Sequence, residues 1–315
     1  IRICRTVHMS EVLDMKYEML LTTPDDVEYM SEKLDAFYDS IVPPSERPST
    51  EGYVLKVSDE NGNIIGGCIA YVNSWDILRI NTLWVDEHHR KCGLGSKLLE
   101  KIEHVGREKG CYLSTLGTGD FQARGFYEKN GYQVCGTVEN SPKGHVSYSM
   151  AKRLDCPILG TVSNHDDGKL HTTTFGTEED GDFIDDKLDE YNCSHATLPN
   201  RYERFGKKFV DEHGNLVAGI FVRADIYRTA NGTDVWGAAN VSVLWVEERY
   251  RNERFGSQLL LDIERTAKEN SGDFILLDVL DCQATIFLKH GYRIVGEIQN
   301  CPRGHRWYTM KKLLE

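Results

Sequence analysis

The sequence lacks the features of a membrane-spanning or disulfide-stabilised protein. No uninterrupted apolar run approaches the roughly 18 residues that a transmembrane helix needs. The nine cysteines are an odd number, and no two of them form a C-x-x-C pair. This pattern argues against a zinc knuckle or a disulfide framework and favours a reducing compartment. We therefore expect a cytoplasmic protein with no metal site and no membrane partner.

Basic residues are also scarce. The 315-residue chain has 37 Lys and Arg against 49 Asp and Glu, a net charge of −12. We expect no nucleic-acid partner, because duplex binding depends on neutralising phosphates with basic side chains. The acidity is concentrated in residues 155–200, which hold eleven acidic residues against Lys169 and Lys187. This stretch is either a solvated linker followed by an exposed helix face or an electrostatic funnel for a cation.

The most informative feature is an internal repeat. "LWVDEHHRKCGLGSKLLEKIE" at 83–103 matches "LWVEERYRNERFGSQLLLDIE" at 244–264, and residues 130–154 match 290–314. Upstream, "KLDAFY" at 33–38 matches "KLDEYN" at 187–192 in the same order. The first pair is offset by 161 residues (83 to 244), which is too long for a solenoid repeat. We therefore predict a duplicated domain, with domains at 1–154 and 155–315.

Each copy is predicted to fold as a mixed α/β sheet. In the first copy, helical spacing of apolar residues predicts a helix at 25–42, and Asn61-Gly62 predicts a hairpin between strands 53–58 and 64–72. An apolar strand at 77–85 follows, then a helix from Leu94 and a strand at 111–118. A short helix at 120–130, capped by Asp120, precedes hairpin strands at 131–138 and 145–154. This order places helices on both faces of the sheet.

A glycine-rich turn, "RKCGLG" at 90–95, joins a predicted strand to a predicted helix. The first N–H groups of such a helix are unpaired, so they form an anion site, and glycines let a phosphate approach the backbone. We expect a pyrophosphate cradle in which Arg90 and Lys91 add positive charge. The third glycine of a dinucleotide fingerprint and the Gly-Lys-Ser/Thr of a Walker A loop are both missing.

This loop and a second motif downstream resemble those of the GCN5-related N-acetyltransferase (GNAT) superfamily. "RKCGLG" fits its signature of Gln or Arg, two variable residues, Gly, one variable residue, and Gly or Ala; "ARGFYEKNGY" at 123–132 fits its second motif. The resemblance covers nearly all of each copy and is weakest at 1–24 and 155–180. It implies two tandem GNAT-like domains, each a mostly antiparallel sheet splayed in the middle, with acetyl-coenzyme A as cosubstrate.

The resemblance also implies residue roles, matched by position. Pyrophosphate would be bound mainly through backbone N–H groups of Arg90, Lys91, Cys92, Gly93, Leu94, Gly95 and Ser96. The pantetheine arm would pair with main chain near Trp84 and Val85, flanked by Asp120, Ala123 and Phe126. Tyr127 matches the tyrosine that protonates the departing thiolate in many members; without the resemblance it is a core aromatic. His145 follows a repeated Pro-Lys/Arg-Gly turn and is a candidate for substrate contact or for hairpin structure alone.

The second copy departs from both motifs. Arg254 replaces the first glycine of the loop, and Phe287 stands in the tyrosine position. A phenyl ring cannot donate a proton, so we predict that the first copy is the active one. The predicted function is acetyl transfer from coenzyme A to a primary amine, a small cationic acceptor, by direct attack in a ternary complex. The alternative is a non-catalytic acyl-coenzyme A sensor or partner-binding module, especially for the second copy, and a homodimer stays open.

Overall fold

The computed structural model describes residues 17–45, 50–156 and 172–314. The elements of the first half are β1 (Tyr17–Leu21), α1 (Pro24–Ile41), β2 (Glu51–Ser58), β3 (Ile64–Val72), β4 (Ile77–Val85), the 3-10 turn η1 (Glu87–His89), α2 (Leu94–Glu108), β5 (Leu113–Gly119), α3 (Arg124–Lys129), β6 (Gln133–Glu139) and β7 (Val146–Arg153). Those of the second half are β8 (Thr172–Phe175), α4 (Glu178–His195), β9 (Arg201–Asp211), β10 (Leu216–Arg228), β11 (Asp234–Val246), η2 (Glu248–Tyr250), α5 (Phe255–Glu269), β12 (Phe274–Leu280), α6 (Asp281–Lys289), β13 (Arg293–Gln299) and β14 (Arg306–Leu313).

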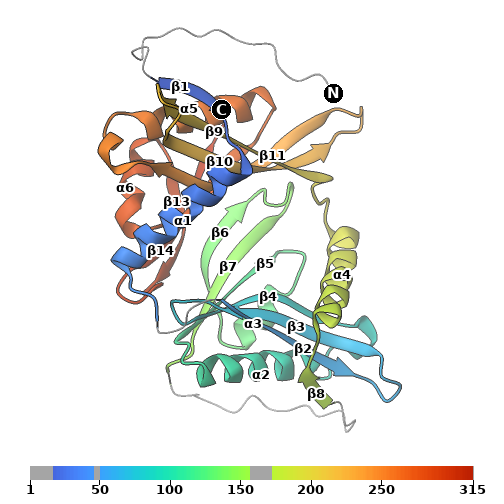
Figure 1. Ribbon diagram of the computed structural model, residues 1–315. Helices are drawn as coiled ribbons and strands as arrows, with labels where there is room; N and C mark the ends of the chain where they lie inside the picture. The colour runs from blue at the N-terminus through green and yellow to red at the C-terminus, as the bar shows by residue number, and fades with distance from the viewer. Residues whose placement is uncertain (1–16, 46–49, 157–171, 315) are drawn as a thin grey trace.

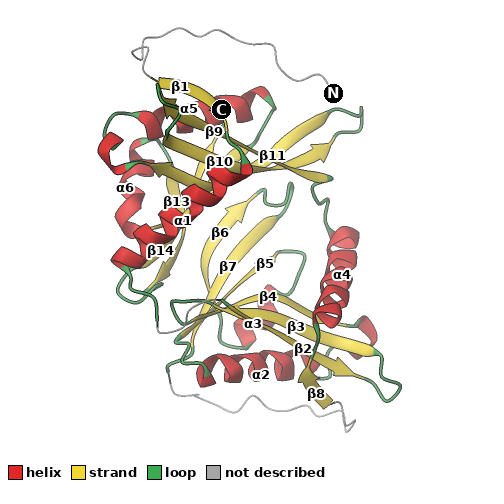
Figure 2. Ribbon diagram, viewed as in Figure 1, coloured by secondary structure: helices red, strands yellow, loops and turns green. Residues whose placement is uncertain are grey.

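The fourteen strands of the described residues belong to one continuous sheet (Figure 1), ordered β1-β9-β10-β11-β12-β14-β13-β6-β7-β5-β4-β3-β2-β8. Figure 2 shows the helices distributed over both faces of the strands. The predicted mixed α/β fold is confirmed. The division into two domains at residues 154 and 155 stays a prediction, because the strands run from one half into the other.

The helix that follows each glycine loop is held by one apolar face. In α2, Leu98, Leu99 and Ile102 are almost completely buried against the sheet, as are Leu259, Leu260 and Ile263 in α5. Burying each such side chain stabilises the fold by about 1.5–3 kcal/mol. This packing fixes the start of each helix at the end of the strand before it.

The first strand and helix of each half are exchanged between the halves. Strand β1 pairs with β9, and β8 pairs with β2. Helix α1 packs on β10 and β11, whereas α4 packs on β2, β3 and β4. Figure 1 shows α1 against the second half's strands and α4 beside β3 and β4. The matching segments 33–38 and 187–192 therefore each lie on the other half's sheet.

Two glycines in equivalent places let the exchanged helices approach the sheet. A Cβ at Gly67 would lie 2.1 Å from Ile184 Cδ1 of α4, and one at Gly219 would lie 2.3 Å from Met30 Sδ of α1. Both Ile184 and Met30 are completely buried. Each helix thus packs on the sheet through one large side chain placed over one glycine, a contact that we call its seat.

The sheet opens in the middle of each half. Parallel pairing of β4 with β5 covers only Ile77–Ile80 and Leu113–Leu116. Pairing of β11 with β12 covers only Ala238–Val241 and Phe274–Leu277. Beyond these residues the strands separate, leaving what we call the first gap (β4/β5) and the second gap (β11/β12). The splay that the resemblance implied is confirmed.

The halves meet at strands β6 and β13. Gly136 pairs with Gly296, and a Cβ on Gly136 would lie 2.8 Å from the Gly296 Cα. The turn around Lys143 reaches across this junction, with Lys143 Nζ 3.1 Å from a carboxylate oxygen of Asp273. The equivalent turn reaches back, with the Arg303 guanidinium 4.0 Å from the Tyr112 ring centroid. The repeated Pro-Lys/Arg-Gly turns therefore make contacts between halves.

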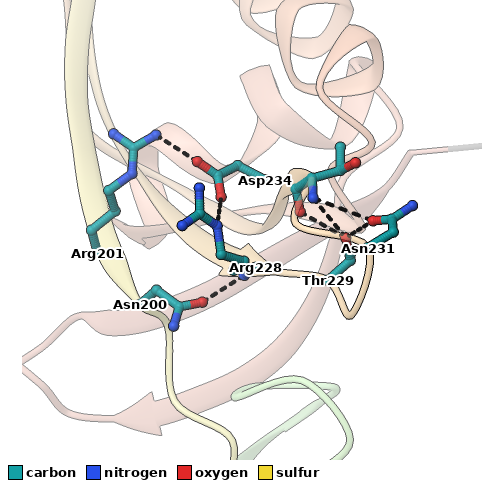
Figure 3. A network of polar contacts seen from close by, with 7 residues as sticks. Asn200, Arg201, Arg228, Thr229, Asn231 and Asp234 are labelled. Atoms are coloured by element: carbon teal, nitrogen blue, oxygen red, sulfur yellow. Dashed lines mark hydrogen bonds and ion pairs between the residues drawn. The ribbon is translucent and has the colours of Figure 1, made fainter.

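The second half carries a longer hairpin than the first. Strands β10 and β11 have 13 residues each, against nine in β3 and β4. Figure 3 shows the polar contacts that brace its end: Arg228 Nε and Arg201 lie 3.2 Å and 3.1 Å from Asp234 carboxylate oxygens. The Arg228 backbone N–H donates to Asn200 Oδ1. These contacts tie the chain that leaves α4 to the hairpin.

Candidate active site

The first gap exposes one edge of β4 at the position predicted for the pantetheine arm. Trp84 and Val85 pair with Gly67 and Gly66 of β3, and the register with β5 has already ended at Ile80. The Trp84 indole faces α4, with an edge-to-face contact to Phe183 at 6.1 Å. Val85 faces α2 instead. Beyond Ile80, β5 no longer pairs with this edge of β4 in the described residues.

The loop after β4 has the conformation of an anion cradle. Lys91 and Gly93 have φ values of 66° and 90°, and α2 begins at Leu94. The first helical N–H bond is from Lys97 to the Gly93 carbonyl. In the described part of the chain, no acceptor contacts the N–H groups of Leu94, Gly95 and Ser96. Those donors and the helix dipole point to an anion at this site.

The side chains of the loop are arranged differently from what the sequence predicts. Arg90 Nε donates to the Val85 carbonyl at 2.9 Å, and its guanidinium lies 4.9 Å from the Tyr191 ring centroid on α4. The Arg90 charge is therefore engaged with the strand and α4. Cys92 Sγ lies 2.7 Å from the His89 carbonyl and closes the turn. Lys91 is exposed beside the loop.

Helix α3 brings the second motif against the loop. A Cβ at Gly95 would lie 3.3 Å from the Phe126 ring, so loop and helix touch. Tyr127 is 8% exposed and packs edge-to-face on Phe126 and Tyr132. Burial, with a smaller effect of Cys68, raises the pKa of the Tyr127 hydroxyl well above its usual range. The phenol is therefore protonated at neutral pH and can act as a proton donor.

The prediction that Asp120 caps the short helix is wrong. Helix α3 begins at Arg124, and its N-cap is Ala123, with no side-chain cap bond. Asp120 instead holds the hairpin: its Oδ1 lies 2.8 Å from His145 Nδ1, and its Oδ2 accepts from the Val146 N–H at 3.1 Å. The Asp120 N–H also donates to the Val146 carbonyl at 2.8 Å, so its carboxylate lies beside the hairpin and binds there instead of capping α3.

The second half repeats this carboxylate–histidine pair. His305 Nδ1 lies 3.2 Å from Asp281 Oδ1, and the Arg306 N–H donates to Asp281 Oδ2. The pair recurs beside Phe287, which is 6% exposed. It therefore does not depend on the tyrosine of the motif.

Helix α4 covers the first gap, a role that the sequence does not reveal. Thr82 of β4 donates its hydroxyl to Asp185. On the far side of the gap, Gln122 Nε2 donates to Asn192 Oδ1 at 2.7 Å, and the Tyr191 hydroxyl donates to the Phe121 carbonyl at 3.1 Å. Helix α4 therefore bridges β4, through Asp185, and the segment that follows β5, through Tyr191 and Asn192.

A line of acidic side chains runs along that bridge. Asp185 and Asp189 are one helical turn apart, and Asn192 follows on the same face. Burial, and then Asp185 and Asp186, raise the pKa of Asp189. The acidic stretch predicted at 155–200 thus contributes Asp185 and Asp189 to the face of α4 that covers the first gap, which we call the roof. Asp166 and Asp167 lie outside the described residues.

The loop of the second half keeps the same backbone without its first glycine. Asn252 and Arg254 have φ values of 71° and 68°, close to those of Lys91 and Gly93. Arg254 is the left-handed N-cap of α5, as Gly93 is of α2. A non-glycine residue in this conformation costs about 1–2 kcal/mol. The packing of α5 therefore imposes the turn even on arginine.

Comparison with known proteins agrees with the motifs. Residues 14–132 match the model of the Acetyltransferase (GNAT) family. The chain is 37% identical over 113 residues to the blasticidin-S acetyltransferase of Streptomyces morookaense, covering 82% of that protein and 36% of this chain. The chain belongs to the GNAT acetyltransferase family. The predicted enzyme class, an acetyltransferase that uses acetyl-coenzyme A, is thereby confirmed.

Further relatives are similar over shorter stretches or in part of the fold. An uncharacterised N-acetyltransferase of Bacillus subtilis is 33% identical over 87 residues, which are 58% of its length and 25% of this GNAT chain. A crystal structure of an acetyltransferase from Bacillus cereus is 39% identical, with 94% of that chain and 42% of this one covered and a TM-score of 0.39. In the described ranges, no helix is both long and apolar enough to cross a membrane.

Proposed function

We propose that the first half transfers an acetyl group from acetyl-coenzyme A to the primary amine of a small cationic acceptor. The pyrophosphate site consists of the N–H groups from Arg90 to Ser96, and the open edge of β4 at Trp84 and Val85 pairs with the pantetheine arm. Asp120, Ala123 and Phe126 flank that arm. Support for the site comes from the bare donors of Leu94, Gly95 and Ser96 at a helix N-terminus.

Tyr127 is the residue to which we assign proton donation to the departing thiolate. A thiol ordinarily titrates near 8.5 and a tyrosine near 10, so the transfer is uphill by about 2 kcal/mol. Burial raises the pKa of Tyr127 and makes a stepwise transfer less favourable still. We infer that the proton moves as the carbon–sulfur bond breaks, when the sulfur is most basic.

The acidic roof carries the proposal of a cationic acceptor. Asp185 and Asp189 lie on the face of α4 that bridges the first gap. An amine with an ordinary lysine-like pKa is protonated at neutral pH, so carboxylates here attract it. His145, whose ring is oriented by Asp120, is proposed to contact the acceptor at the edge of the gap. The relative named for blasticidin-S acetylation supports a small-molecule acceptor.

The second half is proposed to be non-catalytic for acetyl transfer. Phe287 occupies the position of Tyr127 and has no proton to give. Arg254 adds a side chain at the N-cap of α5, where the first half has only Gly93.

A thiol-release assay of the full chain against a panel of amines and anionic acceptors tests the proposal. With a cationic amine, kcat/KM should fall as salt rises, since screening weakens attraction by the roof. Asp189→Asn should raise KM for that amine about fivefold with little change in kcat, the upper range for an exposed ion pair of about 1 kcal/mol. Glu179→Gln, an exposed carboxylate in the first turn of the same helix and outside this face, is the matched control. A flat salt response, or preference for an anionic acceptor, contradicts the cationic acceptor.

A further inference from the structure

The second gap contains a cavity that the acetyl-transfer proposal does not use. Its volume is about 470 Å³, within the range of small-molecule sites. It lies where α1 covers the separated strands β11 and β12, and its lining includes Asp35, Tyr38, Arg223, Asp278, Trp307 and Thr309. Because α1 is exchanged, this site is built from both halves of the chain.

Two carboxylates face this cavity, one from each wall. Asp35 lies on α1 and Asp278 on β12; Asp278 Oδ1 accepts from the Thr309 hydroxyl at 2.6 Å. Within the described ranges, neither carboxylate has a Lys, Arg or His within ion-pair distance. Arg223 also lines the cavity, but its guanidinium lies 3.8 Å from Asp225 and 4.9 Å from the Tyr202 ring centroid. The cavity therefore has two carboxylates that no ion pair engages among the described residues.

The pKa values of both carboxylates are raised. Desolvation raises the pKa of Asp278 in spite of the Thr309 hydrogen bond and the charge of Arg79. Desolvation, and then Asp39, raise the pKa of Asp35. A bound cation would favour the charged form of both groups.

Aromatic rings complete the lining. The Tyr38 and Trp307 ring centroids are 6.2 Å apart, and the Tyr38 hydroxyl donates to Gln283 Oε1 at 2.9 Å, which fixes the ring. Aromatic faces attract organic cations, most strongly where water is excluded. Carboxylates beside fixed rings are thus suited to an alkylammonium group.

The first gap differs at the decisive position. Asp278 is offset by 161 residues from Gly117, the same offset as between the two glycine loops (251 and 90). A Cβ at Gly117 would meet no atom within 4 Å, so space for a side chain exists there but is unused. The carboxylate on this strand is therefore a property of the second gap alone.

We propose that the cavity of the second gap is a binding site for a small organic cation, with Asp35 and Asp278 providing the charge and Tyr38 and Trp307 the aromatic wall. This site is separate from the proposed acetyl transfer, because it needs neither Tyr127 nor the loop of the first half. The ligand class is an amine or quaternary ammonium compound small enough for the cavity.

Fluorine NMR of the full chain labelled with 5-fluorotryptophan tests the proposal with benzyltrimethylammonium. This probe keeps its charge at every pH and has no N–H to acetylate. Trp307→Phe assigns the Trp307 resonance, and Trp84→Phe assigns that of Trp84, which reports on the first gap. Titration should shift the Trp307 resonance saturably. Asp278→Asn retains the shape and the acceptor for Thr309, and should weaken this response at least tenfold, as should Asp35→Asn.

Asp189→Asn, on the roof of the first gap, is the control and should leave the Trp307 response unchanged. Loss of the response in Asp189→Asn but not in Asp278→Asn would overturn the proposal. So would a Trp307 resonance that does not shift at millimolar probe, or one that shifts at the same probe concentrations in Asp35→Asn and Asp278→Asn as in the parent protein. The Trp84 resonance reports on the first gap separately, so failure of the second-gap site is distinguished from failure of the proposed acceptor site. Unchanged thermal midpoints show that the variants are folded.

Discussion

Tyr127 and Phe287 are similarly buried, at 8% and 6% exposed, and each packs on the tyrosine five residues later. Tyr127 packs on Tyr132 at 5.9 Å, and Phe287 packs on Tyr292 at 5.8 Å. Packing therefore explains an aromatic ring at this position in both halves, and the hydroxyl is left for chemistry. The sequence was sufficient to find this difference, because both residues lie in aligned motifs.

We expect Tyr127→Phe to lower kcat by roughly 100-fold, the usual scale for loss of a positioned general acid. Affinity for acetyl-coenzyme A should change little, because only a buried oxygen is removed. Steady-state kinetics and calorimetry with one good amine provide the measurement. Tyr53→Phe, which removes a hydroxyl on β2, separated from the first gap by β3 and β4, is the control and should keep full turnover. Full activity of Tyr127→Phe would refute its role.

The prediction that Asp120 caps the short helix failed because a distant segment supplies its partners. Asp120 has the right type and position for an N-cap, but its carboxylate bonds across the sheet to His145 and the Val146 N–H. Similarly, the Arg90 side chain contacts Val85 and Tyr191, a residue 101 positions later in the chain. Contacts between segments so distant in sequence cannot be predicted from local patterns.

At the scale of elements, the glycine loops show that packing can override conformational preference. Arg254 adopts φ 68° at the position where Gly93 adopts φ 90°. The helix after each loop is held by a buried apolar face, so the residue before the helix must adopt the left-handed conformation that joins it to the strand. The loop shape thus survives in the second half although its first glycine does not.

Arg254→Gly should stabilise the protein by up to about 1 kcal/mol, since glycine removes the cost of the left-handed conformation. Glycine also gives the unfolded chain more freedom, which limits the gain. Chemical unfolding monitored by circular dichroism gives the free energy of unfolding, and turnover should stay nearly unchanged. As a comparison, Gly93→Ala should destabilise the first loop; an Arg254→Gly protein less stable than the parent would indicate that the guanidinium makes a compensating contact.

Most elements were predictable, whereas their exchange was not. Periodicity and turn residues predicted α1, α2, the hairpin strands and both halves of the sheet. The short edge strands β1 and β8 were missed because five and four residues carry little pattern. The repeat identifies 33–38 and 187–192 as equivalent, but equivalent segments satisfy either sheet equally well in sequence. The glycines that receive the helices, Gly67 and Gly219, do not distinguish the two arrangements either, because both halves have one.

The whole molecule therefore has two gaps, each covered by a helix from the other half. Ile184→Ala and Met30→Ala remove the seat of α4 and α1 respectively, at about 2–5 kcal/mol each in a well-packed site. We expect Ile184→Ala to raise KM for the amine, because α4 covers the first gap. Met30→Ala should leave the kinetics unchanged. Steady-state kinetics below the thermal midpoint of each variant test this, and equal effects of the two changes would contradict the exchange.

The division of labour between the halves is tested most directly by one matched substitution. Gly95 and Gly256 occupy the same place in the two loops. A Cβ at Gly95 would lie 3.3 Å from the Phe126 ring, and one at Gly256 would lie 3.4 Å from Val246. Acetyl-coenzyme A-dependent thiol release should be measured for Gly95→Arg and Gly256→Arg in the full chain. We predict that Gly95→Arg lowers kcat/KM for acetyl-coenzyme A more than tenfold, or 1.4 kcal/mol, while Gly256→Arg retains nearly full activity. Loss of activity in Gly256→Arg with a fully active Gly95→Arg would place the transfer in the second half.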